Sequence, residues 1–189
     1  MSDVIQPGHG LVFMKVGTHA GEGLEDIIKR KRAEIDAAGY ALWGYGGNTC
    51  HPFAMVQPFA RSYASGGEPI YLCMQKMTSN HIAVSKRAEK FSADGVDWEP
   101  IPEAISVLGS RYALKIGDLE VSDFELPLSS TVVAIGSSEG RRGDRYIRGR
   151  VDKGCLEVLD SPPEGDPEAD PIKISLTARV LEPYAVLVK

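Results

Sequence analysis

The sequence has few cysteines, few aromatic residues and no excess of positive charge. Its 189 residues include three cysteines and no CxxC pair, which argues against a disulfide framework or a structural zinc site. A reducing compartment fits this cysteine content best. Lysine and arginine together number 21 against 26 aspartates and glutamates, for a net charge of -5. This balance disfavours non-specific binding to duplex nucleic acid, which depends on a broad positive field.

The sequence also has no apolar run of the roughly 20 residues that a membrane-spanning helix needs. Residues 1–9 lack the positive start and apolar core of a signal peptide. We therefore expect a soluble, cytoplasmic protein without a membrane partner. Hydrophobic residues make up 43% and charged residues 25% of the chain, as in globular domains that fold without a metal or a disulfide.

The first half of the sequence alternates between strand-like and helix-like patterns. Residues 11–16 are apolar and partly β-branched, which predicts a buried strand. Residues 23–38 repeat apolar side chains at helical spacing and end before Gly39, which predicts a helix. Further predicted elements are strands at 40–43 and 70–77 and helices at 58–65 and 82–91.

From residue 110 onward the pattern becomes that of short strands separated by Gly, Pro, Asp or Ser, as in an antiparallel sheet or barrel. The predicted strands are 111–116, 119–125, 131–135, 145–151, 155–159, 172–181 and 184–188. Residues 160–171 contain five acidic residues and four prolines and predict a mobile surface loop. The sequence thus predicts an α+β fold, with a short α/β N-terminal portion followed by a β-rich antiparallel sheet or barrel. A single domain over residues 1–189 is expected, and division into lobes 1–105 (α/β) and 106–189 (β-rich) is the alternative.

Two glycine-rich segments, residues 17–23 and 44–51, each follow a predicted strand. Glycines at such a place let backbone amides turn toward a ligand, and a helix N-terminus adds partial positive charge, so these loops could hold phosphate. If the two strands are neighbours, both loops open on one edge of the sheet. Neither loop matches a P-loop or a GxGxxG fingerprint. Plain turn geometry is the commoner explanation of such glycines.

The side chains of these loops supply the candidate site residues. His19 and His51 could act as an acid/base pair on a phosphodiester, and Cys50 could be a nucleophile with His19 or His81 as its base. The structural alternatives are hydrogen-bonded histidines and a buried cysteine. The ligand-binding candidates in the two loops are Gly21, Trp43, Tyr45, Gly46, Gly47, Asn48 and Thr49. Trp43 or Tyr45 would lie against a nucleotide base. No metal-ligand spacing is present, so no metal site and no cofactor are predicted.

A second candidate surface is the basic segment 140–153, of which residues 145–151 are predicted to form a strand. As a strand it would place Tyr146, Arg148 and Arg150 on one face, an arrangement that suits single-stranded nucleic acid. The alternative is an edge strand whose arginines pair with nearby acids, including the acidic loop.

The sequence favours a protein that binds a phosphorylated small molecule, above all a nucleotide, through the two glycine loops. Phosphodiester hydrolysis is the enzymatic extension of this hypothesis. The alternative function is a nucleic-acid-binding or protein-interaction module that uses the basic β face without catalysis. A scaffold without a small ligand is the third hypothesis. The sequence determines neither the oligomeric state nor whether the protein is an enzyme.

Overall fold

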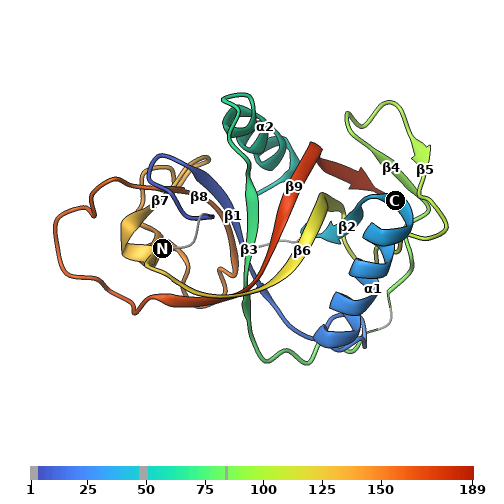
Figure 1. Cartoon of the computed structure of the whole chain (residues 1–189), viewed down its shortest axis with the longest axis horizontal. Helices are drawn as coiled ribbons and strands as arrows, with labels where there is room; N and C mark the ends of the chain where they lie inside the picture. The colour runs from blue at the N-terminus through green and yellow to red at the C-terminus, as the bar shows by residue number, and fades with distance from the viewer. Residues whose placement is uncertain (1–3, 47–50, 84) are drawn as a thin grey trace.

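One large mixed sheet organises the molecule (Figure 1). The computed structural model describes residues 4–46, 51–83 and 85–189. Within this part of the chain, nine strands form a sheet whose main path is β2-β6-β9-β3-β1-β8-β7. Strand β4 pairs with β9, β5 pairs with β4, and three α-helices accompany the sheet. The fold is therefore broadly α+β. Strands β1 and β3 are parallel and the other pairs are antiparallel, so the sheet is mixed rather than purely antiparallel.

The elements follow the chain in this order: β1 Gly10–Val16, α1 Leu24–Ala38, β2 Ala41–Gly44, α2 Phe53–Ala64, β3 Tyr71–Lys76, β4 Lys90–Ser92, β5 Glu99–Pro100, β6 Tyr112–Leu126, η1 Leu128–Ser130, β7 Thr131–Val133, α3 Gly143–Tyr146, β8 Lys153–Val158 and β9 Ile172–Val188. Strands from both halves of the sequence belong to the same sheet. The N-terminal strands therefore do not build a sheet of their own. Among the described residues, none of the helices has the length and apolar character needed to cross a membrane.

The longest pair of strands, β6 and β9, runs across the molecule and replaces four shorter predicted strands (Figure 1). The predicted break near Gly117 and Asp118 is a bulge, because the register with β9 shifts between Gly117 and Glu120. The predicted break near Pro183 lies where the register shifts between Leu114 and Ile116 of β6. A strand can contain extra unpaired residues while its pairing continues on both sides. The turn-forming residues at these two places therefore mark bulges rather than strand ends.

Three other predictions need correction. The helix predicted at 58–65 is present as α2, but it begins earlier, at Phe53, and includes Pro58 within it. The described residues of the segment 82–91 form no helix, and the segment ends in β4. Residues 145–151 form no strand, because α3 occupies Gly143–Tyr146 and a turn follows. Tyr146, Arg148 and Arg150 therefore do not share the period-two face that the alternative function required.

Both faces of β1 are buried, as its uninterrupted apolar run requires. Val12 contributes to the larger core cluster, which also contains residues of α1 and α2, whereas Leu11 and Phe13 contribute to a second cluster around β8. Helix α1 packs against β2 and β6, and α2 packs against β9 and β1. Gly39 ends α1 in the left-handed conformation (φ 82°), which glycine adopts without strain.

The acidic loop after β8 makes ion pairs and hydrogen bonds with the α3 region. Arg145 and Arg148 contact the two carboxylate oxygens of Glu168 at 2.6 and 2.9 Å. Arg142 donates to the Asp166 carbonyl at 2.8 Å, and the Glu168 amide donates to Asp144 at 2.8 Å. The expectation of a mobile loop is therefore wrong for the part around Glu168. Arg148 is one of the arginines that pair with Glu168. This pairing agrees with the alternative in which the arginines contact the acidic loop rather than a nucleic acid.

Candidate functional site

A cavity of about 190 Å³ opens where five loops meet beside α1. It is bounded by the residues after β1, the end of β2, the segments at 77–81 and 106–110, and the start of β8. Its polar lining residues are Lys15, Thr18, His19, Arg30, Lys31, Ser79, His81, Ser106, Ser110, Asp152 and Lys153. Its apolar lining residues are Met14, Val16, Ile27, Trp43, Met77, Val107 and Leu108. A concave space lined by both apolar and polar side chains is a common form of a small-molecule site.

The described parts of both glycine loops line this one cavity. Gly17, Thr18 and His19 come from the first loop, and Gly44, Tyr45 and Gly46 come from the second. The expected reason for their meeting was wrong, because β1 and β2 are separated by β3, β9 and β6 in the sheet.

Curvature of the sheet brings the loops together instead. The Tyr45 hydroxyl donates to the Phe13 carbonyl at 2.9 Å and so joins the end of β2 to the middle of β1. Gly46 lies close to β6, since a Cβ there would lie 2.7 Å from the Tyr112 ring.

The first glycine loop is a tight turn whose amides are used within the fold. Ala20 and Gly21 both have positive φ, 50° and 78°, as a two-residue type I′ turn requires. The amide and carbonyl of His19 pair with those of Glu22 at 3.0 and 2.9 Å. The Ala20 amide donates to Nδ1 of His81 at 3.0 Å, and the Gly21 amide donates to the His81 carbonyl at 3.1 Å. These amides therefore do not form a cradle for phosphate, and a ligand in the cavity would have to be held by side chains.

His19 and His81 lie face to face at this turn. Their ring centroids are 4.7 Å apart and the ring planes differ by 9°. Nε2 of His19 is 2.9 Å from the Leu108 carbonyl oxygen. A carbonyl only accepts, so Nε2 carries the hydrogen and Nδ1 of neutral His19 has the lone pair. The opposite holds for His81, whose Nδ1 accepts from Ala20 and whose Nε2 carries the hydrogen in the neutral ring.

Lys153 places a cation on the same cavity. Its side chain is 14% exposed, and its ammonium lies 3.7 Å from Oδ1 of Asp152, an oxygen that is buried and has no hydrogen-bond partner within the described structure. At this separation the two groups form a loose ion pair rather than a hydrogen bond. Lys153 thus has hydrogen-bonding capacity left for a ligand.

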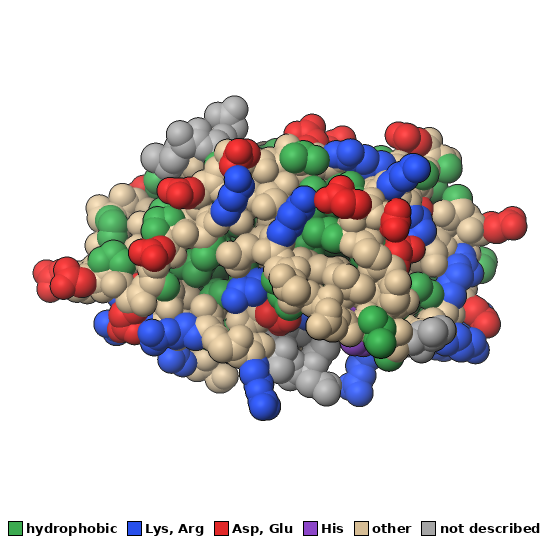
Figure 2. Space-filling model, turned by 90° about the horizontal axis from the view of Figure 1, so that it is seen from below, with side chains coloured by type: hydrophobic (Ala, Val, Ile, Leu, Met, Phe, Trp, Pro, Cys, Tyr) green, Lys and Arg blue, Asp and Glu red, His purple; other side chains and the backbone are tan. Residues whose placement is uncertain are grey.

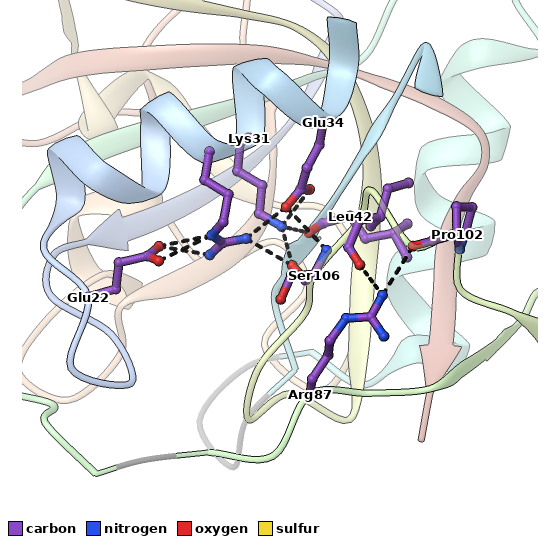
Figure 3. A network of polar contacts seen from close by, with 9 residues as sticks. Glu22, Lys31, Glu34, Leu42, Arg87, Pro102 and Ser106 are labelled. Atoms are coloured by element: carbon purple, nitrogen blue, oxygen red, sulfur yellow. Dashed lines mark hydrogen bonds and ion pairs between the residues drawn. The ribbon is translucent and has the colours of Figure 1, made fainter. Parts of the chain in front are cut away.

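A buried ionic network forms the α1 wall of the cavity (Figure 3). Glu34, which is 2% exposed, accepts from Arg30 at 2.8 Å, from Lys31 at 3.0 Å and from the Ser106 amide at 3.2 Å. Arg30 also binds Glu22, and Lys31 also donates to the Leu42 and Ser106 carbonyls, each at 2.6 Å.

These contacts determine the charge state of the wall. Burial lowers the pKa of Lys31 to about 8, and Glu34 opposes this shift. Burial also disfavours the charge of Arg30, but its bonds to Glu22 and Glu34 outweigh that effect and raise the pKa. All three donors of Lys31 are occupied, so Lys31 holds the wall together and is not available to a ligand.

The structure does not bring His51 to His19. His51 is 7% exposed and does not line the cavity. Its Nδ1 accepts from the Cys155 amide at 3.3 Å and its ring stacks on Tyr146 with centroids 5.9 Å apart. Burial lowers the pKa of His51. The imidazole paired with His19 is that of His81.

The other predicted residues have different environments. Trp43 lines the cavity and is 5% exposed, whereas the Tyr45 side chain is fully buried and bonded to Phe13, so its ring offers no face for a base to stack on. The amide of Gly21 is bonded to His81, and Gly21 does not line the cavity. Four predicted residues lie outside the described part of the chain, namely Gly47, Asn48, Thr49 and Cys50.

Sequence reasoning gave His81 only a secondary role, placed Lys153 only in the basic segment 140–153, and did not identify Ser79 or Ser110. Lys153 follows the predicted strand 145–151, and nothing local distinguishes it from a solvated lysine. The described residues contain no group of three or more His, Cys, Asp or Glu side chains arranged to hold a metal ion. No family model, no curated protein and no solved structure matches this chain.

Proposed function

We propose that this protein binds a phosphorylated small molecule, with a nucleotide as the expected class, in the cavity at the end of β1. The observation that supports this most is that Lys153, His19 and His81 line one cavity together with apolar residues. An ammonium and imidazole nitrogens suit phosphate oxygens, because charge-assisted hydrogen bonds are the stronger kind. Apolar lining residues such as Met14 and Trp43 suit a flat ring.

The size of the cavity limits how much of a ligand it encloses. An apolar cavity of about 150 Å³ holds a benzene molecule. The present cavity, at about 190 Å³, has room for one ring or one phosphoryl group with part of a sugar. The remainder of a nucleotide would lie outside the cavity.

The alternative of a nucleic-acid surface receives less support from the geometry. Arg148 is paired with Glu168 at 2.9 Å and belongs to no strand. On the described part of the face in Figure 2, basic and acidic side chains are interspersed, and no continuous basic area is present. Such a surface lacks the single-signed field on which nucleic-acid affinity depends.

Lys153→Met tests the proposal, because it keeps the length of the side chain and removes the charge. Titration with a panel of mono-, di- and cyclic nucleotides should raise the melting temperature of the parent protein. A ligand at 100 times its Kd stabilises the native state by about 2.7 kcal/mol, which corresponds to roughly 5–11 °C for a chain of this size. Lys153→Met should weaken the binding roughly tenfold to hundredfold, because hydrogen bonds to charged groups contribute about 1.5–3 kcal/mol.

The matched control is Lys173→Met. Lys173 is 64% exposed, pairs with Asp123 at 3.0 Å and does not line the cavity. This control should bind nucleotides like the parent. The proposal is wrong if no nucleotide binds at millimolar concentration, or if the two variants bind equally well.

A further inference from the structure

The two stacked histidines differ in whether a proton on Nδ1 would break one of their hydrogen bonds. The bond from Nε2–H of His19 to the Leu108 carbonyl is present in both the neutral and the cationic ring. Protonation of Nδ1 therefore leaves His19 in its present orientation. His81 is the reverse case, because its Nδ1 already accepts from the Ala20 amide, and a proton there would break that bond.

This difference assigns the two rings different chemistry. His19 can exchange a proton through Nδ1 without moving, which is the property of a general base. His81, whose Nδ1 accepts from the Ala20 amide, has Nε2–H as its free hydrogen-bond donor. The near-parallel stacking, with centroids 4.7 Å apart, places this donor beside His19.

We infer that His19 is the general base of a phosphodiester hydrolysis, with Nε2–H of His81 as a donor to the phosphate and Lys153 as its counter-charge. This inference rests on the proposed function, since it requires a phosphorylated ligand in the cavity. The Lys153 cation in the same cavity suits a phosphoryl centre, whose oxygens remain negatively charged throughout the reaction.

The reaction adds one water molecule to the diester. The oxygen of water bonds to phosphorus while Nδ1 of His19 takes one of its protons. The phosphorus–oxygen ester bond breaks, and its electron pair stays on the departing oxygen. The proton on His19 then passes to that oxygen, so that an alcohol and a phosphomonoester are released and His19 is neutral again. Charge and atoms balance without a further reactant.

The chosen probe is the 4-nitrophenyl ester of adenosine 5′-monophosphate. Its leaving group departs as a coloured anion and needs no proton, so that the rate reports on the attack of water. The parent protein should release 4-nitrophenolate and AMP. His19→Gln is the informative variant, because the Gln amide can still donate to the Leu108 carbonyl but has no basic nitrogen.

His19→Gln should lower kcat by about 10²- to 10⁴-fold, the range for loss of a general base. AMP binding should weaken by a smaller factor than kcat, because Lys153 and His81 remain in the cavity. The matched control is His81→Asn, whose amide oxygen can still accept from Ala20, and it should lose only about tenfold through the missing Nε2–H. In a His19→Ala variant, added imidazole should restore part of the rate, which a merely structural role of His19 would not produce.

Binding and turnover separate the two proposals. If AMP binds and the parent does not cleave the ester, the inference is wrong and the proposed function stands. The inference is also overturned if His19→Gln cleaves like the parent, or if imidazole leaves the rate of His19→Ala unchanged. If neither AMP nor the other nucleotides bind, the proposed function itself fails.

Discussion

Removing the charge of Glu34 should destabilise the protein more than any surface substitution. Glu34 is 2% exposed and is the anion to which Arg30, Lys31 and the Ser106 amide all donate (Figure 3). Glu34→Gln keeps the shape of the side chain but leaves Lys31, which is 4% exposed, without its counter-charge. Breaking a buried ion pair by removing one partner costs about 3–5 kcal/mol, because the remaining charge stays buried.

The loss should be measured as the free energy of unfolding from urea titrations. A cost of about 3–5 kcal/mol corresponds to a fall in Tm of roughly 6–20 °C in a chain of this length. The double variant Lys31→Met/Glu34→Leu replaces both charges by apolar side chains of similar size. It should recover part of the loss, because no unpaired charge of Lys31 stays buried. Recovery is incomplete because the Leu42 and Ser106 carbonyls and the Ser106 amide lose their partners.

The reasoning would be refuted by either of two results. One is a cost below about 1 kcal/mol for Glu34→Gln, which would mean that Lys31 finds water or gives up its proton at little expense. The other is a double variant no more stable than Glu34→Gln alone, since two residues that share one ion pair must show a large coupling energy.

Two further predictions concern residues outside the cavity. Burial lowers the pKa of His51 below its usual 6.5, so that His51 takes up a proton at a higher pH in the unfolded state than in the folded state. The contribution of His51 to the free energy of unfolding should therefore be fully present above pH 6.5 and be lost as the pH falls through the pKa of the folded state. His51→Asn should flatten this loss between pH 7.5 and pH 5.5, and equal urea midpoint shifts in parent and variant would contradict the assignment. Glu168→Gln should weaken the contacts of the acidic loop with Arg145 and Arg148, and hydrogen exchange should accelerate at residues 165–170 but not in β9. Unchanged exchange there would show that the ion pairs do not hold the loop.

Local sequence patterns predicted elements that depend on neighbours along the chain. Helix α1 begins within one residue of the predicted start, because apolar spacing and Gly39 define it without help from the rest of the fold. The sequence patterns gave wrong predictions where a residue type occurs both in turns and within strands. Gly117 and Pro183 are turn formers in isolation, but pairing of β6 with β9 across them makes each site a bulge. Pro58 is tolerated within α2, which packs against β9.

The candidate site was only partly accessible from the sequence, for a related reason. The glycines marked both loops, since close approaches such as that of Gly46 to the Tyr112 ring exclude a side chain. Which loops meet depends on the curvature of the sheet, and the Tyr45–Phe13 bond that records it links residues 32 positions apart in the sequence. The adjacency of β1 and β2 was therefore the wrong basis for expecting the loops together.

The partner of His19 shows why long-range contacts decide chemistry. His51 stands in the second glycine loop, but its imidazole turns into the core toward Cys155, where burial favours a neutral ring with its nitrogens bonded. His81 lies 61 positions from Ala20, and its Nδ1 accepts the Ala20 amide that the type I′ turn leaves unpaired. That turn needs positive φ at both central residues, so Gly21 acts on the site through backbone shape rather than by touching a ligand. A glycine that looks like part of a phosphate loop thereby positions an imidazole pair.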